Sequence, residues 1–267
     1  MRIRTSWRGV ALTTWLVTWL IGAHAAAAQP APTDRVVVRL GVGSRAASRT
    51  FASTTGFTLF SEPGTLRAEY EIQPGSIVDG GLAFRFWRNL AIGLDVSSYQ
   101  SSRNTAQLSA DLPHPFVFDL PRRTTGAALD LERQELAVHI RALWMIRLAD
   151  WLVVSVSGGP SLLHARQDLV ASIEYTELAF PFVEVLFAGH TVDTQSKNTL
   201  GLNGGVDIDT FVLHKLPILN RYGVVRHVGL GLLIQYVRGS VDLQLGDDPI
   251  DVDLGGLQLT AGLRLRF

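Results

Sequence analysis

The chain has 267 residues, of which 24 are basic and 24 acidic, so its formal net charge is zero. A balanced charge gives no long-range attraction for nucleic acid, and the absence of cysteine excludes disulfides, thiolate metal sites and cysteine nucleophiles. Beyond residue 28, no stretch of about 18 apolar residues is free of charge, which argues against membrane-spanning helices. Any membrane crossing must therefore use a closed β-barrel.

The first 28 residues have the three-part layout of a secretory signal peptide. The parts are a basic start, an apolar run and a small-residue cleavage site: Arg2, Arg4 and Arg8; residues 10–23; and Ala26 to Ala28. We predict a removed signal peptide at 1–28, a short linker at 29–34 and a single folded domain at 35–267. The alternative is an uncleaved N-terminal anchor.

Apolar and polar residues alternate with a period of two along most of the predicted domain, which places them on opposite faces of β-strands. About eight such segments occur, near residues 36–43, 78–86, 90–97, 133–146, 152–159, 200–209, 227–236 and 257–267. The pattern predicts an all-β protein. It does not by itself decide whether lipid or a protein core covers the apolar faces, so a soluble β-sandwich or lipocalin-like barrel is the alternative architecture.

The connections alternate between short and long along the chain. Short turns are predicted at 88–89, 148–150 and 214–222, long polar segments at 45–75, 101–131 and 167–197, and a last external loop at 246–249. This rhythm is typical of an antiparallel up-and-down transmembrane β-barrel with short periplasmic turns and long external loops. Further alternation at 66–73 with 50–60, and at 169–175 with 182–191, predicts strand extensions or hairpins above the membrane. A barrel of ten strands is the alternative.

Aromatic residues gather near the predicted periplasmic ends of the strands, where interfacial rings are favoured: Trp87, Trp144, Trp151, Tyr222 and Phe267. With the alternating C-terminal strand and the short and long connections, they make residues 35–267 resemble the small outer-membrane barrels of the OmpA/OmpX type. The resemblance implies that Leu263, Leu265 and Phe267 form the signal read by the barrel assembly machinery. It also implies a Gram-negative outer membrane, contact with membrane lipid including lipopolysaccharide, and a monomer without a cofactor.

A barrel of about eight strands has an interior just wide enough for side chains to fill it. The polar faces carry charges of both signs: Arg39, Asp79, Arg85, Asp95, Arg133, Glu135, Arg141, Asp207, Asp209, Arg264 and Arg266. Buried charges persist when they are paired and hydrogen-bonded, so we predict a cross-strand ion-pair network that plugs the lumen. The alternative is a narrow channel or transporter lined by the same charges.

The predicted role is therefore non-enzymatic, in envelope integrity or in surface contact through the long loops. Three weaker patterns suggest other chemistry. His190, Asp193 and Ser196 suggest a hydrolytic site of a lipid-modifying enzyme, although their spacing matches no motif. Asp247, Asp248, Asp251 and Asp253 suggest calcium binding or simply an acidic, solvated loop. Arg122 and Arg123 suggest contact with lipopolysaccharide phosphates or a solubilising pair at a loop tip.

Overall fold

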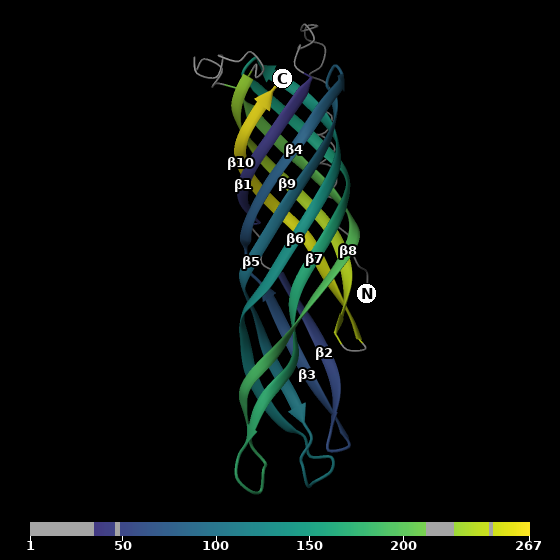
Figure 1. The fold of residues 1–267 in the computed structure, drawn as a ribbon, viewed down its shortest axis with the longest axis vertical. Helices are drawn as coiled ribbons and strands as arrows, with labels where there is room; N and C mark the ends of the chain where they lie inside the picture. The colour runs from purple at the N-terminus through teal and green to yellow at the C-terminus, as the bar shows by residue number, and fades with distance from the viewer. Residues whose placement is uncertain (1–34, 46–48, 212–226, 246–247) are drawn as a thin grey trace, which may run out of the picture. The chain divides into compact units, whose positions relative to one another are not determined.

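The computed structural model describes residues 35–45, 49–211, 227–245 and 248–267 (Figure 1). These residues form ten β-strands, namely β1 (Val36–Arg45), β2 (Arg49–Leu59), β3 (Glu62–Ile72), β4 (Gly75–Trp87), β5 (Leu90–Leu112), β6 (Arg122–Ala149), β7 (Leu152–Glu177), β8 (Val185–Thr210), β9 (His227–Leu245) and β10 (Asp248–Arg266). Among the described residues, no helix is long and apolar enough to cross a membrane.

Eight of the ten strands close into a ring by antiparallel pairing. β1 pairs with β4 on one side and with β10 on the other, and the ring continues from β4 through β5, β6, β7, β8 and β9 back to β10. The remaining two strands, β2 and β3, form a hairpin that pairs with β5 through residues 65–71 of β3. The predicted antiparallel up-and-down barrel of eight strands is confirmed, and the other two strands lie outside the closed ring.

The barrel is much longer than a bilayer requires. β6 has 28 residues, whereas a tilted membrane strand needs about 9 to 11. β5, β6, β7 and β8 continue past the ends of β1 and β4, and β2 and β3 occupy the level beyond (Figure 1). We call the closed ring the basal barrel, comprising residues 36–45, 75–101, 133–165, 199–210, 227–237 and 256–266. The continuation, with β2 and β3, is the distal barrel.

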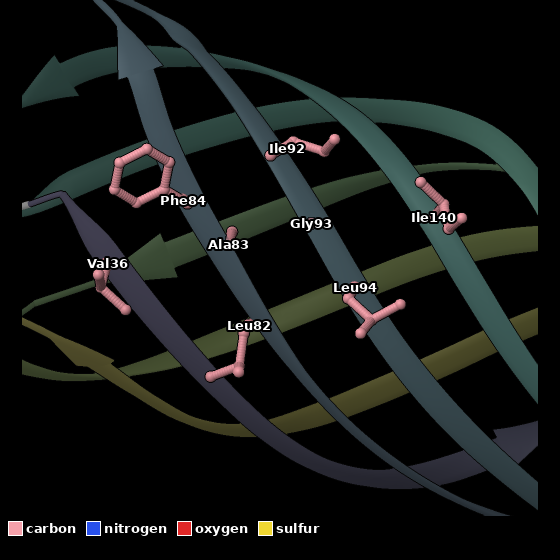
Figure 2. Close-up of a pocket in the computed structure, with 8 residues that line it drawn as sticks. All are labelled: Val36, Leu82, Ala83, Phe84, Ile92, Gly93, Leu94 and Ile140. Carbon is pink, nitrogen blue, oxygen red and sulfur yellow. The ribbon is translucent and has the colours of Figure 1, made fainter.

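The outer face of the basal barrel is apolar. Its large aliphatic and aromatic side chains are solvent-exposed, including Leu40, Val42, Val78, Leu82, Phe84, Ile92, Leu94, Leu136, Ile140, Leu162, Leu200, Leu202, Leu230, Ile234, Leu257, Leu259 and Leu263. Figure 2 shows part of this face, where six such side chains surround the backbone of Ala83 and Gly93 in a shallow apolar hollow. An apolar band of this extent, wrapped around a barrel, is the surface of a transmembrane β-barrel.

The distal barrel has the opposite distribution, with apolar side chains inside and polar ones outside. Its core contains Leu66, Tyr70, Leu108, Leu131, Leu169, Leu243, Ile250 and Val252, all buried. Within this core the Tyr70 ring stacks on Phe51 at 4.5 Å between centroids, and its hydroxyl accepts a hydrogen bond from the Val170 N–H at 2.8 Å. Burial raises the pKa of Tyr70. This is the pattern expected of a water-soluble β-sheet, which the alternative architecture predicted for the whole chain.

The reversal is visible within the single strand β10, whose even-numbered residues face the interior from 250 to 266. Its inward residues change from apolar in the distal part, at Ile250, Val252 and Leu254, to polar in the basal part, at Gln258, Thr260 and Arg264. Its outward residues change in the opposite sense, from the acidic Asp251 and Asp253 to the apolar Leu257, Leu259 and Leu263. The change falls at Gly255 and Gly256, which have φ angles of 80° and 129°. Only glycine adopts such angles without strain.

Backbone pairing closes the basal barrel but not the distal one. Among the described residues, β2 pairs with β3 alone, and β8 pairs with β9 only from Gly201 to Thr210. Beyond Gly201, side chains bridge the two strands instead, because Lys197 and Thr199 of β8 donate to the carbonyl oxygens of Asp242 and Ser240. The distal barrel is thus a curved sheet with two unpaired edges and a separate β9–β10 hairpin.

The structure corrects the predicted loops. The segments 45–75, 101–131 and 167–197 were expected to be long connections, but most of their residues belong to strands. The two additional pairings predicted inside them are present, because 50–60 pairs with 66–73 as β2 with β3, and 169–175 pairs with 182–191 in the distal parts of β7 and β8. The expected turn at 88–89 is present, and the turn expected at 148–150 falls at 150–151. Trp87, Trp144 and Trp151 are exposed towards this end. Arg35 and Phe267, hydrogen-bonded to each other, lie at the same end. The predicted signal peptide, linker and turn at 214–222, with Tyr222, lie outside the described residues.

The apolar band predicts a position-dependent cost for charge on one strand. Ile140→Arg, on the outer face of β6 in the basal barrel, should lower the free energy of unfolding of the barrel in lipid vesicles by about 2–4 kcal/mol. Thr125→Arg is the matched control, because it lies on the outer face of the same strand in the distal barrel, and it should change stability by less than about 0.5 kcal/mol. Urea titration in vesicles measures both. Equal costs would contradict the placement of lipid.

Candidate functional site

The lumen of the basal barrel contains a chain of six charged side chains that alternate in sign. Arg141 contacts Asp95 at 2.6 Å (Nε to Oδ2), and Asp95 also pairs with Arg39. Arg39 then donates to Asp207 at 2.9 Å. Arg264 completes the chain by donating to Asp207 at 3.0 Å and to Asp209 at 2.9 Å. We call these six residues the luminal chain; three are basic and three acidic, so their formal charges cancel.

The luminal chain crosses the barrel from one wall to the other. Its members come from β5, β6, β1, β8 and β10, and each is at most 7% exposed as a side chain. Space for it is provided by Gly81 on β4, since a Cβ at this position would overlap the Asp95 carboxylate. Because every member contacts a partner of opposite charge, the desolvation of each ion is offset by pairing. These side chains extend across the interior between strands on different sides of the ring.

A second cluster lies nearer the distal barrel and is centred on the fully buried Glu135. Arg45 donates to both carboxylate oxygens of Glu135, at 2.8 and 2.9 Å, and Arg133 donates to one of them at 2.8 Å. The Gly255 N–H donates to Glu135 at 3.1 Å. The Arg45 guanidinium also lies 3.7 Å from the ring centroid of Tyr99, a cation–π contact. This bidentate and doubly paired carboxylate lies at the level of the basal barrel that adjoins the distal barrel.

Between the two charged levels lies a neutral polar layer. The buried His139 ring contacts Ser97 at 3.0 Å through Nε2 and Ser161 at 2.7 Å through Nδ1. Asn203 donates to the same Ser161 hydroxyl at 2.9 Å. The layer links β5, β6, β7 and β8, so that the interior of the basal barrel is cross-linked by polar contacts at three successive levels.

Ten of the eleven charged residues predicted to face inward are buried. Asp79 is buried, but its Oδ1 has no hydrogen-bond partner among the described residues. The Arg266 guanidinium lies 3.5 Å from the ring centroid of Phe211. Arg85 is half-buried. Sequence reasoning missed Arg45, which was assigned to a loop, although it continues the inward parity of Arg39 along β1.

The residues suggested as a hydrolytic site do not form one. His190, Asp193 and Ser196 all lie on β8, where six residues of extended strand separate His190 from Ser196 by about 20 Å. The Asp193 carboxylate instead accepts a hydrogen bond from Gln195 at 2.6 Å. Joint catalysis would require these side chains to lie within hydrogen-bond reach of one another, and a separation of this size is too large for that.

The remaining weak patterns are also resolved in part. Asp251 and Asp253 point outward from β10, and no group of metal-ligating side chains occurs among the described residues; Asp247 lies outside them. Arg122 and Arg123 face opposite sides of β6. Arg122 is buried and pairs with Glu177 at 2.9 Å, whereas Arg123 is exposed and pairs with Asp111 at 2.8 Å. Arg122 is therefore not accessible to a surface phosphate, nor does it solubilise a loop tip.

Neither a protein-family model nor a curated protein matches this sequence. Solved structures similar to the chain include Neisserial surface protein A (NspA), with 12% identity, a TM-score of 0.44 and coverage of 87% of this chain and 96% of that one. The outer membrane protease OmpT from Escherichia coli has 10% identity, a TM-score of 0.41 and coverage of 90% and 99%. Ail, the attachment invasion locus protein of Yersinia pestis, has 11% identity, a TM-score of 0.32 and coverage of 86% and 99%.

The luminal chain predicts a large cost for removing its central cation. Arg39→Ala leaves Asp95 without one partner and Asp207 without one partner, and should destabilise the folded barrel by about 3–5 kcal/mol. Arg67→Ala is the control, because Arg67 pairs with Glu69 on the exposed surface, and should cost at most about 1 kcal/mol. Urea denaturation in detergent micelles compares them. A loss below 1 kcal/mol for Arg39→Ala would show that the luminal ion pairs do not support the fold.

Proposed function

We propose that this chain is an integral protein of a Gram-negative outer membrane, with a closed lumen and a role at the cell surface. The observation that supports this most strongly is the reversal of polarity between the two parts of the barrel. The basal barrel is apolar outside and charged inside, whereas the distal barrel is polar outside and apolar inside. An apolar exterior followed by a polar exterior along the same strands fits a protein that crosses a lipid bilayer and then extends into water.

The proposed orientation puts the distal barrel outside the cell. A signal peptide at 1–28 would deliver the chain to the periplasm, and the described domain begins and ends at the end that carries the short turns. Short turns face the periplasm in barrels of this type. Leu263, Leu265 and Phe267 then lie at the periplasmic end, where the barrel assembly machinery would read them. Lipid, including lipopolysaccharide, would surround a monomeric basal barrel.

A surface role is favoured over transport and catalysis. A conducting pore needs a continuous water path, while here charged and polar side chains cross the lumen at three levels. The hydrolytic trio on β8 is too widely spaced for joint chemistry, and we propose no enzymatic activity and no cofactor. The distal barrel, by contrast, is extensive, and charged residues on its outer face make it unsuited to a bilayer. Its size is best explained by contacts made beyond the membrane.

Fractionation tests the proposed location. Full-length protein expressed with its own signal sequence should be found in the outer-membrane fraction and should migrate faster on gels before boiling than after, because the folded barrel resists detergent. A chain that stays monodisperse in buffer without detergent would contradict the proposal, since the exposed apolar band would then have no lipid to cover it.

Planar-bilayer recording tests the closed lumen. The wild-type protein should give no steady conductance, because the luminal chain obstructs the tube. Arg141→Ala and Asp207→Ala shorten side chains that cross the lumen and should increase ion leakage, whereas Arg67→Ala on the exposed surface should not. Steady single-channel currents in the wild type would overturn the plugged lumen and support the narrow-channel alternative.

A further inference from the structure

The far end of the distal barrel carries a cluster of exposed apolar side chains on two adjacent loops. The loop between β5 and β6 contributes Phe116, Val117, Phe118 and Leu120, and the loop between β7 and β8 contributes Leu178, Phe180 and Val183. The three phenylalanines are 72, 75 and 82% exposed in chain order. Rings this accessible to water are costly to leave uncovered. We call the two loops, residues 113–121 and 178–184, the distal tip.

The two loops are fixed to each other by buried polar groups. Arg122 donates to the carbonyl oxygens of Pro113 in the first loop and Phe182 in the second, at 2.8 and 3.1 Å, and pairs with Glu177 at 2.9 Å. The His114 Nε2 contacts the Pro181 carbonyl oxygen at 3.0 Å. The exposed rings are therefore held on a preorganised platform, which lowers the entropy lost when they bind a surface.

The backbone of the distal tip satisfies many of its hydrogen bonds internally. The N–H groups of Phe116 and Val117 donate to His114 Nδ1 at 3.2 and 3.1 Å. Across the tip, Asp119 N–H donates to Glu62, Leu178 N–H to Glu184 O and Phe182 N–H to Ala179 O. Irregular backbone enters a hydrocarbon medium at lower cost when its polar groups already have partners. This favours lipid as the covering medium.

The composition of the tip also favours lipid over a protein partner. Protein interfaces depend on Trp, Tyr and Arg as anchors, and neither loop contains any of these residues. The exposed side chains are phenylalanine and aliphatic, and the rings of Phe116 and Phe180 both pack near Phe182, at 5.7 and 6.1 Å between centroids. The exposed charges within the loops, Asp119 and Glu184, are acidic. They disfavour an anionic lipid surface.

We propose that the distal tip inserts its exposed phenylalanines into the interface of a zwitterionic lipid bilayer apposed to the one that holds the barrel. The proposal rests on the proposed function for the orientation of the barrel. The distal barrel then acts as a spacer between two membranes, and the tip as its lipid-binding end. Interfacial insertion of a few apolar side chains gives reversible binding that scales with the apolar area buried.

Vesicle flotation tests the proposal. Full-length protein held in amphipol should float with phosphatidylcholine vesicles, and less with vesicles that also contain phosphatidylglycerol. The triple variant Phe116→Ser, Phe118→Ser, Phe180→Ser should bind at least about a hundredfold more weakly than the wild type, because three exposed rings are removed. The matched control is Leu129→Ser, Val192→Ser, which removes exposed apolar side chains from the strands of the distal barrel and should bind like the wild type.

A single-site probe separates insertion from adsorption. The chain contains no cysteine, so Phe118→Cys carries one environment-sensitive dye, whose emission should shift to the blue with vesicles and be quenched by brominated acyl chains. An unshifted dye, or equal flotation of the triple variant and the wild type, would overturn the proposal. Association of the wild-type amphipol particles with one another in the absence of vesicles would also overturn it, if the triple variant does not associate, because the tip would then bind a second copy of the protein.

Two controls keep the outcomes distinct. Heat-modifiable gel mobility of each variant establishes that its barrel is folded before binding is compared. Failure of the proposed function would appear as a chain that remains in the aqueous fraction, whereas failure of the lipid-binding tip would appear as an outer-membrane barrel that does not float with vesicles.

Discussion

Closure of the backbone hydrogen-bond ring is the constraint on which the rest of this structure depends. In hydrocarbon an unpaired N–H or C=O costs several kcal/mol, so the basal strands must form a ring without an edge. β1 makes that closure by pairing with both β4 and β10. Beyond the basal barrel the requirement no longer applies, and there the pairing between β8 and β9 ends at Gly201 and β2 pairs with β3 alone.

The closed ring also determines what fills its interior. A tube of eight strands has room for side chains and little else, and its outward positions are committed to lipid. Charged and polar residues therefore occupy much of the inside, beside a small apolar cluster that contains Leu143, and their charges must be paired. The chain from Arg141 to Asp209 does so by alternating sign, and Glu135 by binding two arginines. Such pairs give less stability than an apolar core of equal volume would, but removing one partner is costly.

In the distal barrel water takes the place of lipid outside, so the apolar residues move to the interior while the strands continue. The same six strands, β5 to β10, run through both parts. Tyr70 illustrates the difference, because its hydroxyl is satisfied by a backbone N–H within an otherwise apolar core. The side-chain pattern of each segment therefore reflects the medium around it rather than the type of strand.

The basal barrel could be predicted from sequence because period-two alternation and inward charges coincide there. The segments Leu136 to Ile146 and Leu257 to Phe267 both combine regular alternation with arginine on the inward face. In the distal barrel, the β2–β3 hairpin and the β7–β8 extension were predicted as hairpins, whereas the distal parts of β5 and β6 were taken for a loop. Register shifts near Asn104 in β5 and near Val170 in β7 interrupt the alternation there. Arg122 could not have been predicted to be buried, because its burial depends on contacts with a loop 60 residues away.

The polar exterior of the distal barrel has a consequence for the order of assembly. Arg67, Glu69 and Arg123 lie on its outer face, and hydrocarbon is a prohibitive environment for such groups in a folded sheet. In the proposed orientation, these polar segments have to cross the bilayer before the ring is complete. The pairing of β1 with β10, which joins the two ends of the described domain, would then form last, because a closed ring leaves no passage for a hydrophilic hairpin.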